Sequence, residues 1–156
     1  MIVSPPGGAA FALNVAVWLV WSATAGYVGH RVSPARFERS NRVTRLRAFE
    51  AGGRWYERRL AIKRWKDRLP EAGSLFAGGF SKRSVRRAEL GRYVIETRRA
   101  ELVHWSVLSI WPLFAIWNPP WAVGVMLGYA LVANVPCLVV QRYNRARLLR
   151  ILGTSE

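Results

Sequence analysis

The sequence has little of what many soluble enzymes and disulfide-rich proteins use. Its 156 residues include one cysteine, Cys137, and two histidines, which excludes a disulfide framework and a zinc cluster. The patterns G-x-S-x-G and H-E-x-x-H are absent. Neither His30 nor His104 has an aspartate five positions later, so the H-x-x-x-x-D arrangement of common glycerolipid acyltransferases is excluded. Any chemistry must rest on another arrangement.

Acidic residues are also scarce, and two long stretches carry no charge at all. The chain has 24 Lys+Arg against 9 Asp+Glu, a net charge of +15, with 51% hydrophobic residues. Residues 9–29 and 121–140 hold no charged side chain, and each has the roughly 20 residues that cross a hydrocarbon core. We therefore predict two transmembrane helices. The first is expected to be a retained anchor, because it lacks the positively charged residues that precede the apolar part of a secretory signal.

A third apolar run, residues 102–117, has only 16 residues before the Asn118-Pro119-Pro120 turn. A helix must extend back to about residue 98 to span a bilayer of roughly 30 Å. The predicted span 98–117 would then bring Glu101 and His104 into the inner leaflet. The alternative is a shorter or tilted helix whose polar end only reaches the interface.

The positive residues predict the orientation of these spans. Of the 24 Lys and Arg residues, 20 lie between residues 30 and 102 and 4 follow residue 140. The positive-inside rule then predicts an outside N-terminus, a cytoplasmic basic segment at 30–97 and a cytoplasmic tail at 141–156. The expected fold is a single all-α integral membrane domain with three transmembrane helices, located in the cell membrane with its site at the cytoplasmic leaflet.

The basic segment mixes cations with aromatic and aliphatic residues, which is typical of helices that lie in the headgroup plane. We expect one interfacial helix over residues 36–49, a break at Gly52-Gly53 and a second helix over 55–69. Lipid phosphates are always within reach of such a segment, so anionic lipid is expected as the partner rather than nucleic acid. Residues 71–82 form a Gly-rich loop in which Lys82 is a weak candidate for a phosphate contact; the alternative is a flexible loop whose hydrophobic tip dips into the interface. In either case we expect Ser84 to cap the helix that leads into the second span.

The predicted site lies where the basic segment enters the second span. Arg98, Glu101, His104 and Trp105 share one helix face. Glu101 is expected to orient the imidazole of His104 while Arg98 keeps that carboxylate ionised. Ionisable groups within a leaflet favour a functional site, although a salt-bridged collar is the alternative. An E-x-x-H spacing also occurs in di-iron bundles, but those need two such motifs, so no metal is expected.

The third span runs back from the Pro119 turn, so residues equidistant from it lie at similar depth. This register sets His104 against Asn134 and Glu101 near Cys137. Further polar positions continue toward the cytoplasm, and we expect them to face or close the site, leaving Arg147 and Arg150 as a stop-transfer cluster. Taken over both spans, the candidate substrate-binding residues are Arg98, Trp105, Asn134, Gln141, Arg142, Asn144 and Arg145.

Several of these stretches resemble one known family. The segments are 95–105 (IETRRAELVHW), 133–136 (ANVP) and 140–148 (VQRYNRARL), with a weaker likeness at Arg64-Trp65-Lys66. They are similar to the glycosyl-4,4'-diaponeurosporenoate acyltransferase family of carotenoid (staphyloxanthin) biosynthesis. The resemblance implies a membrane enzyme that esterifies a sugar hydroxyl of a glycosylated carotenoid with a fatty acyl chain; a related glycolipid acceptor would make the same demands.

The residues and the resemblance suggest one mechanism. His104, held by Glu101, would take the proton of the sugar hydroxyl as general base, and Asn134, Arg142 or Arg145 would stabilise the oxyanion. The acyl donor would be acyl-CoA or acyl carrier protein, its phosphates met by cations such as Lys66 and Lys82, with no further cofactor. Three helices enclose little volume, which leaves a homo-oligomer or the lipid to supply a wall. The alternative function is a non-catalytic membrane subunit that docks an anionic partner through its basic face.

Overall fold

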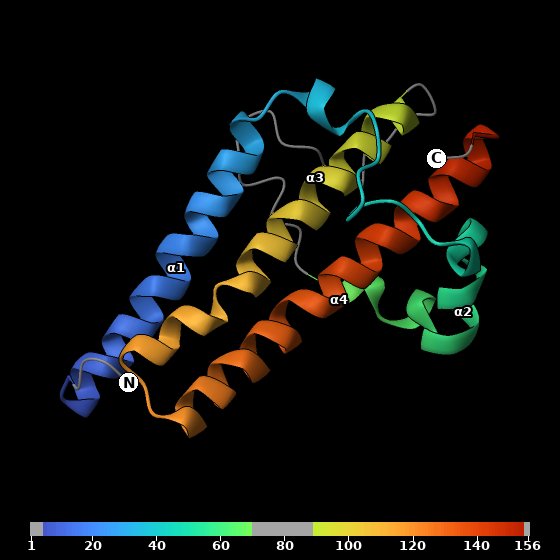
Figure 1. Cartoon of the computed structure of the whole chain (residues 1–156). Helices are drawn as coiled ribbons and strands as arrows, with labels where there is room; N and C mark the ends of the chain where they lie inside the picture. The colour runs from blue at the N-terminus through green and yellow to red at the C-terminus, as the bar shows by residue number, and fades with distance from the viewer. Residues whose placement is uncertain (1–4, 70–88, 155–156) are drawn as a thin grey trace.

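The computed structural model describes residues 5–69 and 89–154, and within these ranges all regular structure is helical. Three long helices lie side by side (Figure 1): α1 (Gly7–Arg31), α3 (Leu90–Ser109) and α4 (Pro120–Leu152). Two of them, α1 and α4, are long and apolar enough to cross a membrane by length and composition. The all-helical class is confirmed, while the number of spans and their orientation stay predictions.

The α3–α4 hairpin is shaped by prolines. Pro112 lacks a backbone N–H, so α3 gives way to the 3₁₀ helix η8 (Trp111–Ile116). Pro119 is extended at φ −68° and ψ 160°, and Pro120 begins α4, in the position where a missing N–H does no harm. The predicted turn at 118–120 is therefore where the chain reverses, and α4 continues through Pro136 well beyond the predicted end of its apolar part.

Near the 118–120 turn, α1 packs against the α3–α4 hairpin through aromatic rings and a buried pair of asparagine side chains. Trp18 of α1 stacks on Phe114 at 5.0 Å between ring centroids. Asn14 donates to the Oδ1 of Asn118 at 3.1 Å and accepts from the indole of Trp117 at 2.7 Å. Asn14 is thus a helix-packing residue, as its place in an apolar helix indicates.

At the other end of the bundle α1 approaches α3 closely. A Cβ atom added to Gly29 would lie 2.5 Å from the Cγ2 atom of Val103, which is too close for any side chain. Glycine at this position lets the two backbones meet, as small residues do between packed helices. The contact fixes the end of α1 beside the charged half of α3.

The predicted interfacial helices are not what the structure contains. Residues 36–49 comprise the end of the 3₁₀ turn η1 (Pro34–Phe37), an irregular stretch and the start of η2 (Ala48–Gly53). The break at Gly52-Gly53 is confirmed, since both glycines have positive φ, at 63° and 79°. A short helix α2 (Arg54–Leu60) follows, and then the turns η3 (Ile62–Arg64) and η4 (Lys66–Arg68).

The prediction of long helices in this segment failed because its backbone carbonyls are bound elsewhere. Arginines of α3 and α4 take the carbonyl oxygens between residues 37 and 45 as acceptors, which competes with a regular helical ladder. The segment packs against α4 through Tyr56 and Ile62, which bury Tyr143 and Val140. The Gly-rich loop, Lys82 and Ser84 lie outside the described residues.

Candidate active site

The predicted register across the hairpin brings one polar pair together. The Nδ1 atom of His104 on α3 lies 3.0 Å from the Oδ1 atom of Asn134 on α4. Asn134 is 3% exposed, and its amide nitrogen donates to the carbonyl of Ala130 at 2.9 Å. The prediction that His104 faces Asn134 is confirmed.

This pairing determines which ring nitrogen of His104 carries the proton. Because the amide nitrogen of Asn134 bonds the Ala130 carbonyl, the amide oxygen is the atom that faces the ring. An oxygen only accepts, so the neutral imidazole must donate from Nδ1. Its Nε2 atom then keeps a lone pair, the state that a general base requires.

Glu101 has other partners than the one predicted. Its carboxylate is completely buried; Oε1 receives Nη1 of Arg142 and Oε2 receives Nη2 of Arg145, each at 2.6 Å. The expectation that Glu101 orients His104 is therefore wrong in this structure. Charge-assisted bonds to guanidinium groups are about twice as strong as neutral ones, so the two arginines of α4 occupy the carboxylate.

Arg98 also lies elsewhere than predicted. Its Nη1 atom donates to the carbonyl oxygens of Phe37 and Glu38 at 3.1 and 2.7 Å. The positive charge facing Glu101 comes instead from α4. Arg98, at 5% exposure, ties the segment after η1 to α3.

The carboxylate of Glu101 belongs to a larger cluster that we call the ion network: Glu50, Glu101, Arg142 and Arg145. Arg142 reaches both carboxylates, with Nε and Nη2 at 2.7 and 2.6 Å from the oxygens of Glu50. It also donates to the carbonyls of Val43 and Arg45, and Arg145 donates to that of Thr44. The network thus clamps the irregular 43–50 segment over α3 and α4.

Glu50 is held ionised by this arrangement. Burial by itself would raise its pKa, but hydrogen bonds from Arg142, the Tyr56 hydroxyl and the Arg47 amide outweigh burial and lower it below the usual 4.5. The pKa of Tyr56 is raised, first by burial and then by its hydrogen bond to Glu50. Tyr56 therefore stays a neutral donor to a carboxylate.

The remaining predicted residues are spread around this core. Trp105 is 41% exposed, and Gln141 is half-buried on α4. Asn144 donates to the Tyr93 hydroxyl at 3.2 Å, which ties α4 to α3. Lys66 pairs with Asp67, and Arg147 is exposed.

Glu50 and Tyr56 were missed from the sequence. Glu50 is the only acidic residue between Glu38 and Glu57, in a stretch with five Lys or Arg residues, and such a lone carboxylate could have indicated a buried ion pair. Tyr56 gives no comparable signal, because aromatic residues are common in basic interfacial segments. In residues 5–69 and 89–154, no three His, Cys, Asp or Glu side chains gather as a metal site would need.

Comparison with known proteins gives a consistent result. A family model described as glycosyl-4,4'-diaponeurosporenoate acyltransferase matches residues 37–154. Proteins of that name from Staphylococcus aureus strains bovine RF122 / ET3-1 and MRSA252 are each 30% identical over 139 residues, covering 86% of this chain and 83% of the relative. No solved structure matches significantly. The matched range includes α3, α4, the ion network and the His104–Asn134 pair.

Proposed function

Because the chain belongs to the glycosyl-4,4'-diaponeurosporenoate acyltransferase family, we propose that it transfers a fatty acyl chain to a sugar hydroxyl of a glycosylated carotenoid or a related glycolipid. The observation that carries a residue-level mechanism is the His104–Asn134 pair, 3.0 Å apart between α3 and α4. The family supports the reaction class, and the pair supports a base within the bundle.

The reaction takes place at a membrane in this proposal. Large apolar side chains on α1 and α4 point away from the bundle, as Leu19, Trp121 and Val132 do at 66%, 74% and 77% exposure. A core helix of a soluble protein would bury such residues, whereas lipid accepts them. We further propose that α3 and η8 form the third pass, since they run between α1 and α4 (Figure 1), with the cations at the cytoplasmic side.

His104 is the general base. Its Nε2 atom takes the proton of the sugar hydroxyl as the hydroxyl oxygen attacks the carbonyl carbon of an acyl thioester. The tetrahedral intermediate then collapses, the C–S bond breaks and the imidazolium returns the proton to the departing thiolate. Such acid–base help contributes about 10²- to 10⁴-fold in rate.

In this mechanism Asn134, and not Glu101, holds the imidazole of His104 in position. An asparagine also orients the histidine of papain-like proteases, so a carboxylate is not required. All three nitrogens of the Arg142 guanidinium are occupied by Glu50, Glu101 and main-chain carbonyls. We therefore assign Arg142 to the clamp rather than to the substrate.

Replacing the base tests the assignment. In protein reconstituted with a glycosyl carotenoid and an acyl-CoA, we expect His104→Ala to lower kcat by about 10²- to 10⁴-fold. Asn134→Ala should lower it by about three- to tenfold, the equivalent of one neutral hydrogen bond. Cys137→Ala, one turn along α4, is the control and should retain the native rate.

Equal rates for His104→Ala and the native protein, with both folded in the same micelles, would overturn the assignment of the base. The reaction itself is tested separately in cells with and without the gene. Their lipid extracts should differ by a glycolipid or glycosyl carotenoid heavier by one acyl chain. If no such mass difference is found, the alternative of a non-catalytic subunit with a basic docking face is favoured.

A further inference from the structure

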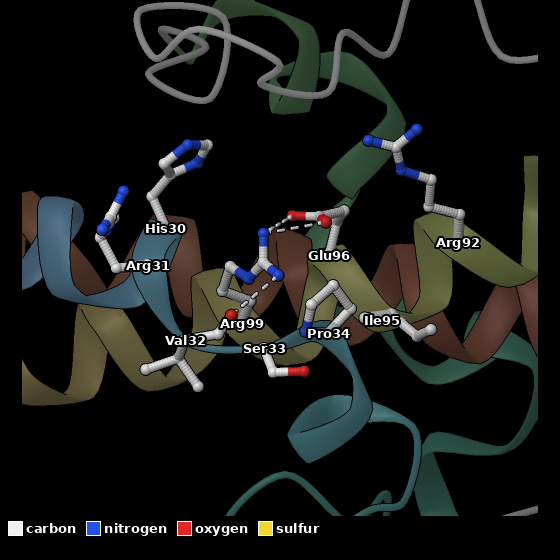
Figure 2. Close-up of a pocket in the computed structure, with 9 residues that line it drawn as sticks. All are labelled: His30, Arg31, Val32, Ser33, Pro34, Arg92, Ile95, Glu96 and Arg99. Atoms are coloured by element: carbon white, nitrogen blue, oxygen red, sulfur yellow. Dashed lines mark hydrogen bonds and ion pairs between the residues drawn. The ribbon is translucent and has the colours of Figure 1, made fainter.

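A second polar feature lies on the opposite face of α3, away from Glu101 and His104. A pocket of about 390 Å³ opens where the last turn of α1 meets α3, a volume in the range of small-ligand sites, about 300–1,000 Å³. Figure 2 shows His30 and Arg31 at one side, Arg92 at the other and the Glu96–Arg99 pair between them. The full lining is His30, Arg31, Val32, Ser33, Pro34, Arg92, Ile95, Glu96 and Arg99.

The charge of this lining is strongly positive. Three arginines face one carboxylate, Glu96. Both oxygens of Glu96 lie 3.1 Å from the Nη1 atom of Arg99, so that its charge is compensated within the helix. Arg31 and Arg92 are exposed, and the three arginines and one glutamate of the lining carry a formal charge of two positive units.

One donor at the pocket also lacks an acceptor. Arg99 binds Glu96 through Nη1 and the carbonyl of Val32 through Nη2 at 3.4 Å. Its Nε atom is buried and has no hydrogen-bond partner among the described residues. A buried N–H without an acceptor costs about 1–3 kcal/mol, and an anionic ligand in this pocket would supply acceptor oxygens.

We propose that this pocket binds a phosphate group. A phosphate presents acceptor oxygens in several directions, which suits guanidinium groups placed at opposite sides of a pocket, and arginine pairs with phosphate in two-pronged geometry. A carboxylate has only two oxygens in one plane and leaves one side unfilled. Ser33 also lines the pocket.

Two ligands bring this chemistry to the cytoplasmic end of the bundle: the phosphates of a coenzyme A thioester and the headgroup of an anionic phospholipid. The first rests on the proposed acyl transfer, and the second does not. His104 lies five residues beyond Arg99 on α3, a rise of about 7.5 Å. A donor anchored at this pocket would thus have to reach around α3 to the base.

Coenzyme A without an acyl chain is the probe for the first source, since it binds without reacting. In nanodiscs of phosphatidylcholine we expect Arg31→Gln/Arg92→Gln to weaken its Kd tenfold or more, because hydrogen bonds to charged groups are involved. Arg58→Gln is the matched control: an exposed cation on α2 that is not among the pocket-lining residues. Its Kd should equal that of the native protein.

Phosphatidylglycerol is the probe for the second source. If the native protein binds no coenzyme A but retains this lipid in native mass spectrometry, and Arg31→Gln/Arg92→Gln loses it while Arg58→Gln does not, the pocket holds a headgroup. Either pattern supports a phosphate site. The proposal is overturned if both probes bind equally to the double variant and to Arg58→Gln. Coenzyme A binding that survives in His104→Ala separates this site from the catalytic assignment.

Discussion

The two faces of α3 use the same residue types in opposite ways. On the face toward α4, Glu101 is completely buried and both of its oxygens are held by arginines of another helix. On the face toward α1, Glu96 pairs with Arg99 of its own helix, and both side chains stay partly exposed, at 19% and 13%. The first arrangement joins elements distant in sequence, whereas the second stays within one helix.

What an ion pair contributes depends on its burial and on whether its partner comes from the same helix or from another one. Removing one partner of a buried pair strands a charge in the interior, at a cost of about 3–5 kcal/mol. An exposed pair three residues apart contributes less than about 1 kcal/mol. Glu101 and Glu96 lie five residues apart on one helix, so the comparison between them is open to direct test.

Stability should change most when Glu101, on the α4 face of α3, is replaced. Glu101→Gln should lower the free energy of unfolding by about 3–5 kcal/mol, because Arg145 loses its carboxylate and Arg142 keeps only Glu50. Glu96→Gln, the matched change on the other face, should cost less than about 1 kcal/mol. Both are measured by tryptophan fluorescence during unfolding in mixed micelles.

A compensating double variant separates the lost charge from lost packing. Glu101→Met/Arg145→Met removes both ends of the fully buried pair and should recover part of the stability, since apolar residues often replace buried ion pairs at little cost. Equal losses for Glu101→Gln and Glu96→Gln would contradict the distinction between the two faces.

A substitution at Gly29 tests the packing of α1 against α3. Gly29→Ala should destabilise the protein by about 1–3 kcal/mol, because the new Cβ would meet Val103 at 2.5 Å. It should also weaken coenzyme A binding by moving Arg31 away from Arg92. Gly124→Ala is the control: its Cβ would meet nothing within 4 Å, and alanine is the better helix former by about 1 kcal/mol. Similar unfolding curves for the two variants would refute the close approach of α1 and α3.

A smaller effect should appear in acid. The pKa of Glu50 is lowered below 4.5 in the folded protein, so its contribution to stability is present above about pH 4.5 and is lost as the pH falls through the lower, folded-state value. The unfolding temperature of the native protein should thus drop more steeply below pH 4.5 than that of Glu50→Gln. Parallel curves from pH 3 to 7 would show that Glu50 is not held ionised by the ion network.

The register of the hairpin was predictable, because two prolines mark the turn and helical rise sets the depth on both sides. Counting from Pro119 was enough to set His104 against Asn134. The partner of Glu101 was not predictable by the same count. Arginine side chains are long and lean toward the N-terminus of their helix. Arg142 and Arg145 therefore reach back along α4 to Glu101, which the count from Pro119 places at the depth of Cys137.

The conformation of the 38–50 segment was also not predictable from its local sequence. Cations at helical spacing with apolar residues between them predict an interfacial helix. In the structure the carbonyls of Val43, Thr44 and Arg45 are bound by side chains about a hundred residues away in sequence. No window of local sequence contains that competition, so propensity was overridden by tertiary contacts.

Composition, spacing and proline positions were enough to predict the all-helical class, the long apolar stretches, the hairpin and the family motifs. Which side chains contact one another depended on the packing of the helices. In the packed bundle His104 faces Asn134, and Glu101 binds two arginines. The opposite face of α3 lines a basic pocket. The physical reason is that charge pairing depends on distance in space, and long side chains from separate segments compete for the same carboxylate once the helices have packed.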